Sequence, residues 1–306
     1  MVHLPRPEGA TDADFKPTRR ALAGLMMFAG YALGGGPARA ETVHTDEAGL
    51  FTREATIPSN GFDLPAYVAM PADAKKRPVV IVVSEIFGVH EYIRDTARRL
   101  AKAGYVAIAP AFFARAGDPA PLTDQDEIRK IVATATNAQV MGDIKATIAW
   151  LGTNPDIGQP RKGFGKAKFA DTKRIGVTGF CWGGAVVWMA AAQIPQIKAG
   201  VAWYGRLAKP KAGAFLGDEN RAWPLDVVQE LHAPVLGLYA GQDQGIPLSD
   251  VDAMRAALKA AGEKRDEIVV YPDAKHGFHA DYRQSYDQAA AEDGWKRLLA
   301  WFGKYL

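Results

Sequence analysis

The sequence predicts an α/β fold: one doubly wound, mostly parallel sheet with helices on both faces. Two observations predict it. Short continuous apolar runs, such as Pro78 to Val83, are typical of strands buried in a parallel sheet, and they alternate along the chain with stretches of helical period. Alternating strands and helices form right-handed βαβ units. The 306 residues, 48% hydrophobic and 23% charged, fit one large α/β domain or two smaller ones. No repeat or second domain boundary is visible, so we expect a single domain over residues 41–306.

The first 40 residues have the pattern of a cleavable export signal. Arg19-Arg20 precedes an apolar run, Ala21 to Leu33, and Ala38-Arg39-Ala40 is a small-x-small cleavage site. The run is too short to span a bilayer of about 30 Å as a helix. The paired arginines favour the twin-arginine route, with a Sec signal or a mis-set start codon as alternatives. We therefore expect a periplasmic or secreted chain that begins at Glu41, and a cytoplasmic chain is the alternative.

The balance of acidic and basic residues limits the kinds of partner that the mature chain is expected to bind. Lys and Arg number 37 and Asp and Glu 34; residues 1–40 hold five and three of these, which leaves 32 against 31. A balance so close to neutral argues against nucleic acid or an anionic membrane as the main partner of the mature chain. We expect a small-molecule substrate, the export machinery as partner of the signal, and neither a metal nor a cofactor.

The chain opens with a predicted antiparallel hairpin, because Ser59-Asn60-Gly61 separates two β-like runs with turn residues. The loop between residues 114 and 126, rich in Pro, Asp and Gly, is expected to form part of a pocket rim, and we expect residues 162–173 to form a solvated basic loop.

Strands are predicted at Leu50 to Ile57, Leu64 to Met70, Pro78 to Val83, Tyr105 to Ala109, Ile175 to Thr178, Ile197 to Tyr204, Pro234 to Ala240 and Ile268 to Tyr271. Helices are predicted at Glu91 to Ala103, Ile128 to Leu151, Ala185 to Gln193, Ser249 to Ala261 and Tyr286 to Phe302.

The segment that organises the site is Gly179-Phe180-Cys181-Trp182-Gly183. It lies between a β-run and a helix, which is the context of a nucleophile elbow, here with sulfur in place of the serine oxygen. The glycines are needed where strand and helix backbones crowd together. Cys181 is the only cysteine, so no disulfide or Cys-rich metal site competes for it. The alternative is a buried cysteine that packs as a small hydrophobe beside a Gly-rich bend.

Two further polar residues, Asp243 and His276, follow predicted strands, so they should meet Cys181 at one edge of the sheet. The chain order nucleophile, acid, histidine is that of α/β-hydrolases. His276 would take and return the thiol proton, and Asp243 would fix the imidazole tautomer. The backbone N–H groups of Ile86 and Trp182 would form an oxyanion hole.

Each of these residues has an alternative interpretation. Asp243 could be a turn former and His276 an ordinary loop histidine. His279 is close enough in sequence to be a rival base. Asp250 falls in the first turn of a predicted helix, where a solvated acid is expected. Joint placement favours Asp243 and His276, because three independent turn residues would rarely fall at three strand ends in this order.

The chain resembles the dienelactone hydrolase family, also called carboxymethylenebutenolidases. The resemblance runs from about Pro65 to the C-terminus and rests on Glu85-Ile86-Phe87-Gly88, Gly179-Phe180-Cys181-Trp182-Gly183-Gly184, Gly241-Gln242-Asp243 with Ile246-Pro247, and Ala274-Lys275-His276-Gly277-Phe278. It implies an α/β-hydrolase fold and a Cys181–His276–Asp243 triad. It also implies that Glu85 contacts the resting thiol and takes part in its activation as substrate binds.

The chain departs from the family at the substrate carboxylate. Two arginines hold it in the family, one of them four residues after the histidine, where this chain has Ala280. The nearest arginine is Arg283, and Arg129 or Lys130 matches the other. We expect Arg129, Arg283 and Tyr204 to contact the substrate.

The leading interpretation is a cysteine hydrolase that cleaves a lactone or small ester through a thioester intermediate. A general carboxylesterase or thioesterase is the nearest alternative. Basic side chains facing Cys181 would favour an anionic lactone, and an apolar cleft would favour esters. The alternative from another functional class is a non-catalytic binding or redox-sensing protein that has kept the hydrolase fold.

Overall fold

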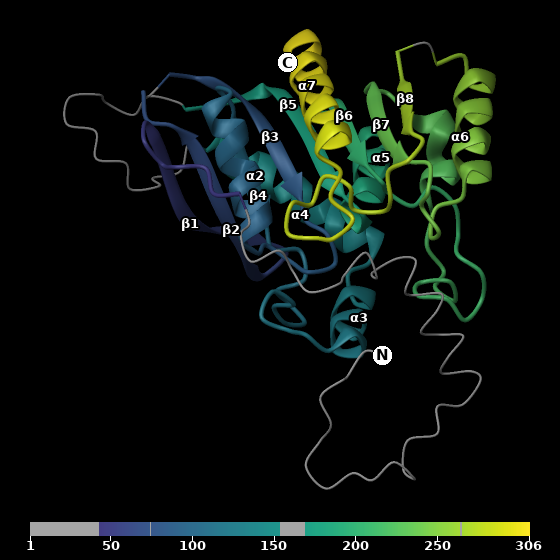
Figure 1. Ribbon diagram of the computed structural model, residues 1–306. Helices are drawn as coiled ribbons and strands as arrows, with labels where there is room; N and C mark the ends of the chain where they lie inside the picture. The colour runs from purple at the N-terminus through teal and green to yellow at the C-terminus, as the bar shows by residue number, and fades with distance from the viewer. Residues whose placement is uncertain (1–42, 74, 154–168, 264) are drawn as a thin grey trace, which may run out of the picture.

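Within the described residues, one eight-stranded sheet has the order β1-β2-β4-β3-β5-β6-β7-β8 (Figure 1). The computed structural model describes residues 43–73, 75–153, 169–263 and 265–306. The mostly parallel sheet with helices on both faces confirms the predicted fold class. The strands are β1 Leu50–Ser59, β2 Phe62–Pro71, β3 Arg77–Val83, β4 Val106–Pro110, β5 Ala170–Phe180, β6 Ile197–Trp203, β7 Val235–Ala240 and β8 Glu267–Tyr271.

The predicted hairpin is present as β1 and β2, which pair antiparallel from Leu50 opposite Pro71 to Ser59 opposite Phe62. Asn60 and Gly61 connect them with φ angles of 49° and 75°, the left-handed conformations that a two-residue hairpin turn requires. β2 also pairs antiparallel with β4. From β4 to β8 every neighbouring pair is parallel, so these strands end at one edge of the sheet.

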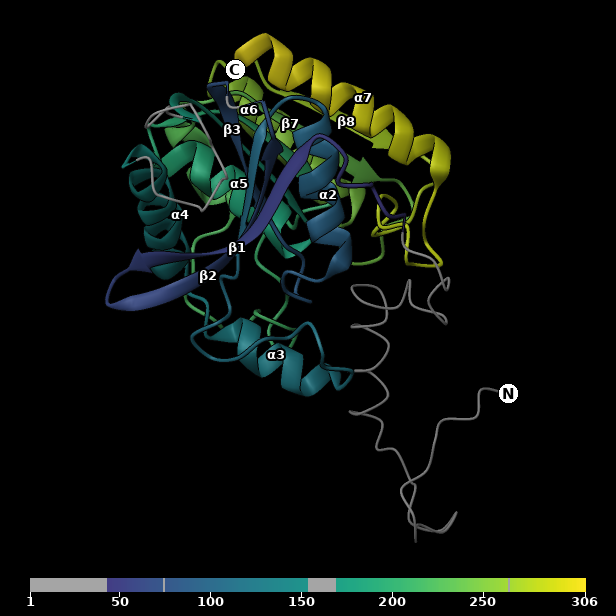
Figure 2. The same ribbon diagram turned by 90° about the vertical axis from the view of Figure 1, so that its left-hand side faces the viewer.

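Helices cover both faces of the sheet (Figures 1 and 2). One hydrophobic core lies under α4, α5 and α6, and the other lies under α2 and α7. The elements are α2 Glu91–Lys102, α3 Gln125–Ala133, α4 Asn137–Gly152, α5 Trp182–Gln193, the 3₁₀ helix η1 Pro224–Glu230, α6 Leu248–Ala260 and α7 Gln288–Tyr305. In Figure 1, α3 lies beyond the edge at which the parallel strands end.

The prediction of one helix from Ile128 to Leu151 is wrong. The chain forms α3 and α4 instead, and α3 begins inside the stretch predicted as loop. Each helix has its own side-chain cap: Asp124 accepts from the backbone N–H groups of Asp126 and Glu127, and Thr136 accepts from that of Gln139. A cap residue has non-helical backbone, so Thr136 ends any continuous helix at that point.

Strand β5 is longer than predicted and reaches back to Ala170, into the stretch predicted as a basic loop. The carboxylate of Asp171 pairs with Lys76, which directly precedes β3, at 3.0 Å and with Arg174 of β5 itself at 2.8 Å. Most of the predicted loop, residues 162–168, lies outside the described residues, as does the predicted export signal.

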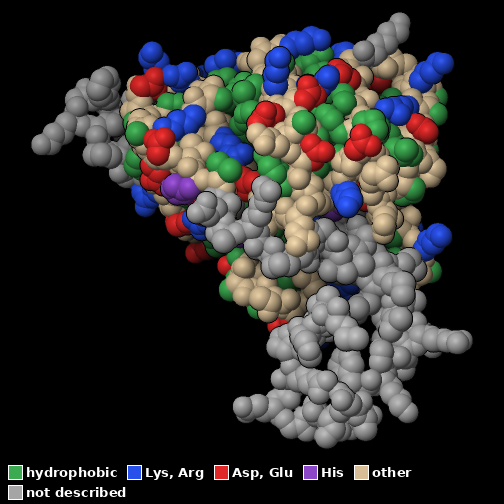
Figure 3. Space-filling view, viewed as in Figure 1, with side chains coloured by type: hydrophobic (Ala, Val, Ile, Leu, Met, Phe, Trp, Pro, Cys, Tyr) green, Lys and Arg blue, Asp and Glu red, His purple; other side chains and the backbone are tan. Residues whose placement is uncertain are grey.

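Acidic and basic side chains are interspersed on the face seen in Figure 3, as the near-neutral charge balance leads one to expect. Within the described ranges, no helix combines the length and the apolar character needed to cross a membrane.

Candidate active site

Cys181 lies on a sharp turn between β5 and α5, at φ 56° and ψ −114°. A side chain at Gly179 would place its Cβ 2.3 Å from the carbonyl oxygen of Gly183, and one at Gly183 would place it 2.4 Å from that of Val83. Both glycines are therefore required for backbone to cross backbone here. The turn has the strand–turn–helix form predicted for a nucleophile elbow, with the cysteine 1% exposed.

His276 and Asp243 meet beside this turn. The Nδ1 atom of His276 lies 2.7 Å from Oδ2 of Asp243, and both side chains are buried. The other carboxylate oxygen, Oδ1, accepts hydrogen bonds from the backbone N–H groups of Gly245 at 2.8 Å and Ile246 at 3.0 Å. Asp243 is therefore held at both oxygens. It is this residue, and not Asp250 in the first turn of α6, that bonds to His276.

The electrostatics of His276 include Cys181. Burial works against a charged imidazole, but the carboxylate of Asp243 and the sulfur of Cys181 outweigh it and raise the pKa of His276 to about 10. A neighbour contributes in this way only when it lies close to the ring. Residues from the ends of β5, β7 and β8 are thus brought together at the edge that the sequence indicated.

His279, the rival base, lies in different surroundings. It is buried, with its Nδ1 atom 2.6 Å from the hydroxyl of Tyr92 and its ring stacked on Phe180 at 5.3 Å. Burial, with a smaller effect of Arg99, lowers its pKa to about 3. A neutral imidazole already bonded to a tyrosine hydroxyl is a satisfied core residue.

Glu85 follows β3 and lies beside the elbow. Val83 pairs with Gly179 in the parallel register, so two further residues along each strand bring Glu85 level with Cys181. The carboxylate is fully buried. Its Oε2 atom accepts a hydrogen bond from the hydroxyl of Tyr282 at 2.6 Å, and its Oε1 atom lies 3.1 Å from Nη2 of Arg283.

Arg283 is a buried cation between Glu85 and the elbow. Burial opposes its charge, but Glu85, Tyr282 and Cys181 outweigh this and raise its pKa. The guanidinium stacks over the ring of Phe87 at 5.1 Å. Its Nη1 atom is buried and has no hydrogen-bond partner among the described residues. Sequence reasoning named Arg283 only as a substrate contact, and it missed Tyr282 altogether because no local pattern links either residue to Glu85.

The remaining predicted residues differ in how near they lie to this cluster. Tyr204 directly follows β6 with a φ of 37°, is fully buried and packs its ring edge-on against His276 at 5.2 Å. Arg129 is on α3, with its Nη1 atom 2.9 Å from Oδ1 of Asp126. Trp182 is the first residue of α5, where a backbone N–H has no acceptor inside the helix. Ile86 lies in the turn after β3, next to Glu85.

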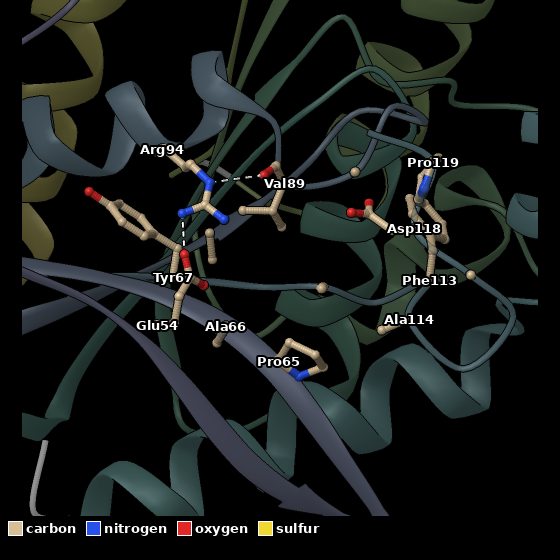
Figure 4. A pocket seen from close by; sticks show the side chains of 14 residues that line it. Glu54, Pro65, Ala66, Tyr67, Val89, Arg94, Phe113, Ala114, Asp118 and Pro119 are labelled. Atoms are coloured by element: carbon tan, nitrogen blue, oxygen red, sulfur yellow. Dashed lines mark hydrogen bonds and ion pairs between the residues drawn. The ribbon is translucent and has the colours of Figure 1, made fainter. Parts of the chain in front are cut away.

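A cavity of about 140 Å³ lies beside Val89, in the segment between β3 and α2 (Figure 4). Gly88 and Val89 line it on one side, and Phe113 and Asp118 line it on another. None of the predicted catalytic residues lines it. Phe113 connects it to the elbow, because its ring packs on Trp182 at 4.7 Å. Within the described part of the chain, no group of three or more His, Cys, Asp and Glu side chains could hold a metal ion.

A family model described as "Dienelactone hydrolase family" matches residues 64–306. The chain belongs to the dienelactone hydrolase family. A protein of Methylorubrum extorquens named "Putative carboxymethylenebutenolidase" is 46% identical over 97% of this chain and 98% of its own length. A protein of Escherichia coli K12 with the same name is 45% identical over 90% of this chain and 95% of its own length.

Solved structures agree with this assignment. A crystal structure described as a putative dienelactone hydrolase from Klebsiella pneumoniae is 46% identical, with a TM-score of 0.72 over 84% of this chain and 99% of that chain. This member of the dienelactone hydrolase family is therefore a hydrolase with an α/β-hydrolase fold.

Proposed function

We propose that this dienelactone hydrolase cleaves a lactone or small ester by nucleophilic catalysis, with Cys181 as nucleophile, His276 as proton acceptor and Asp243 as the residue that orients His276. The observation that carries the proposal is the 2.7 Å contact between His276 and Asp243, combined with the electrostatic influence of Cys181 on the same imidazole. Three groups with matched roles, brought together after the ends of parallel strands of one sheet, are what nucleophilic catalysis needs.

The steps follow from this geometry. His276 takes the proton of Cys181, and the thiolate attacks the carbonyl carbon of the substrate. The N–H groups of Ile86 and Trp182 stabilise the oxyanion. The intermediate collapses to a thioester as the C–O bond breaks, and His276 gives its proton to the departing oxygen. Water, deprotonated by His276, then hydrolyses the thioester and regenerates the thiol.

Arg283 supports a substrate that carries a carboxylate. Its charge lies close enough to Cys181 to be influenced by the sulfur, and its Nη1 atom has no hydrogen-bond partner within the described residues. A buried donor without a partner is costly, so an anionic group of the substrate would be well placed to accept from it. This favours an anionic lactone over the neutral substrates of a general carboxylesterase, although a thioesterase remains the second candidate because its chemistry uses the same three residues.

Glu85 is proposed to control the thiol. In the resting protein its carboxylate is bound by Tyr282 and Arg283. An anionic substrate that takes Arg283 would release Glu85, and the sulfur, which already lies beside His276, would then pass its proton to that residue. Export of the mature chain from Glu41 to the periplasm is proposed on the pattern of the first 40 residues alone.

The test is a panel of lactones, aryl esters and thioesters, with a carboxylated and an uncarboxylated member of each class, assayed on the mature protein. We expect the highest kcat/KM on a carboxylated lactone. Cys181→Ala should lower this value by at least about three orders of magnitude, as removal of a triad member does. Activity near the wild-type level in Cys181→Ala would overturn the proposal.

A further inference from the structure

His90 is a buried histidine that the proposed chemistry does not use. It directly precedes α2 and makes no side-chain cap to that helix. Its ring stacks on Tyr92 at 5.9 Å and meets Tyr282 edge-on at 5.1 Å. Its Nε2 atom is buried, has no hydrogen-bond partner among the described residues, and lies 3.9 Å from Oε2 of Glu85.

The proposed function leaves Glu85 in need of a new hydrogen-bond donor, which Nε2 of His90 can supply. A fully buried carboxylate that loses its cation is strongly destabilised unless another donor replaces it. When an anionic substrate takes Arg283, Glu85 loses that partner. Nε2 of His90 is a buried nitrogen without a hydrogen bond among the described residues, and it lies 3.9 Å from Oε2 of Glu85. A shift on the order of 1 Å by the Glu85 carboxylate would bring the two atoms to ordinary hydrogen-bond distance.

We propose that His90 is a positioning residue that donates its Nε2–H to the Glu85 carboxylate when an anionic substrate occupies Arg283. The inference rests on the proposed function and concerns the same site. No proton is transferred in this step: Glu85 stays ionised and exchanges one donor for another. His90 thereby lowers the cost of opening the Glu85–Arg283 pair, and it does so only for substrates that bring a negative charge.

The charges around His90 agree with a neutral donor. Burial lowers the pKa of His90. Glu85, Glu91 and Asp118 act in the opposite direction, and Arg283 adds to the lowering. The hydroxyl groups of Tyr92 and Tyr282, on the elements packed against the ring, have pKa values raised by burial and stay protonated. At neutral pH the imidazole is therefore uncharged and can donate without forming a second ion pair.

Two variants separate the N–H group from the packing. His90→Phe keeps a ring against Tyr92 and Tyr282 but has no donor. His90→Gln loses the ring but can place an amide N–H near the position of Nε2. His232→Gln is the matched control, because His232 lies in the loop before β7 and its Nε2 atom bonds to the carbonyl of Ile194. Thermal unfolding of each variant checks that it folds.

The readout is alkylation of Cys181 by iodoacetate and by iodoacetamide. In both reactions an S–C bond forms and iodide leaves, but only iodoacetate carries a carboxylate that can take Arg283. The rate ratio of iodoacetate to iodoacetamide, relative to the same ratio for a free thiol, therefore measures the release of Glu85 by an anion. It needs no knowledge of the physiological substrate. Cys181→Ala gives the unlabelled background.

We expect His90→Phe to lower this ratio about ten- to hundredfold, the effect of one hydrogen bond to a charged group. His90→Gln should stay within about threefold of the wild-type ratio, as should His232→Gln. An unchanged ratio in His90→Phe overturns the role of His90 and leaves the proposed function intact. An equal fall in both His90 variants also overturns it, because packing would then be the cause.

Two other outcomes concern the proposed function. A wild-type ratio no higher than that of a free thiol would show that Arg283 does not receive an anion, which overturns the anionic substrate and the role of His90 together. If the ratio falls as expected but no lactone or ester is hydrolysed, the proposed function fails and the role of His90 stands.

Discussion

Replacing Asp243 by Asn should leave the loop in place but put an amide NH₂ group, in place of a carboxylate oxygen, against Nδ1 of His276. Oδ1 of Asp243 accepts from the backbone N–H groups of Gly245 and Ile246, and Asn can keep that oxygen in place. Its amide nitrogen then faces Nδ1 of His276, which must present a lone pair to it. The imidazole proton is consequently held on Nε2, the atom that has to accept the proton of Cys181.

The orientation of the Asn amide accounts for part of the effect. Turning the Asn amide over would break both backbone hydrogen bonds, at about 0.5–1.5 kcal/mol each. The useful orientation would then be populated in roughly one molecule in five at most and in one in 150 at the other limit. The variant also lacks the carboxylate that raises the pKa of His276, while the burial that lowers it remains. We expect kcat/KM to fall about 10³–10⁴-fold, as when a triad Asp becomes Asn.

The assay is kcat/KM on the best substrate of the panel, together with iodoacetamide alkylation of Cys181 at pH 7. Alkylation should slow in Asp243→Asn, because a less basic His276 no longer holds the thiol proton. Asp250→Asn is the control and should stay within a few fold of wild type. A crippled Asp250→Asn beside a mild Asp243→Asn would refute the reasoning.

Three further predictions follow from other residues. Glu85→Gln should slow turnover about tenfold or more and change the pH dependence of Cys181 alkylation, because the charge beside Cys181 is gone. If both the turnover and the pH profile of alkylation matched those of the wild type, Glu85 would have only a structural role. Burial raises the pKa of Asp266 to about 6, so its contribution to stability is present below about pH 4 and lost as the pH rises through 6. Asp266→Asn, which can still accept from the N–H of Val235, should therefore raise the free energy of unfolding by about 1–2 kcal/mol at pH 8 and not at pH 4; equal urea midpoints at pH 8 would contradict this. N-terminal sequencing of the exported protein should begin at Glu41, and an intact Met1 in the cytoplasm would exclude export.

The sequence was sufficient wherever the signal was local or followed from sheet topology. Cys181 could be placed because the glycines around it mark a turn between strand and helix. Asp243 and His276 could be placed because parallel strands end at one edge. The catalytic roles of these residues remain predictions.

The break between α3 and α4 also has a local signal in the sequence. Thr136 and Gln139 have the spacing of a capping box, and the Thr136 side chain accepts from the Gln139 backbone. Core spacing across both helices concealed it, because a hydrophobic stripe can continue through a short break.

The pairing of Glu85 with Arg283 could not be predicted from the residues alone. The two are separated by most of the chain, and their contact depends on how the loop after β8 folds over the loop after β3. The same holds for His279, whose hydrogen-bond partner Tyr92 lies on α2. Periodicity determines which face a residue occupies, but it does not determine which buried polar group it meets there.

The crowding of glycine backbone at the elbow limits how this enzyme can evolve. A single methyl group at Gly179 or Gly183 would collide with main-chain oxygen, and no neighbouring side chain can move aside to make room. The position of the sulfur is therefore closed to gradual adjustment by point mutation. New substrate preferences must arise in segments that can accept substitution one residue at a time, such as the irregular stretch between β6 and η1, while the reacting atom stays where the backbone holds it.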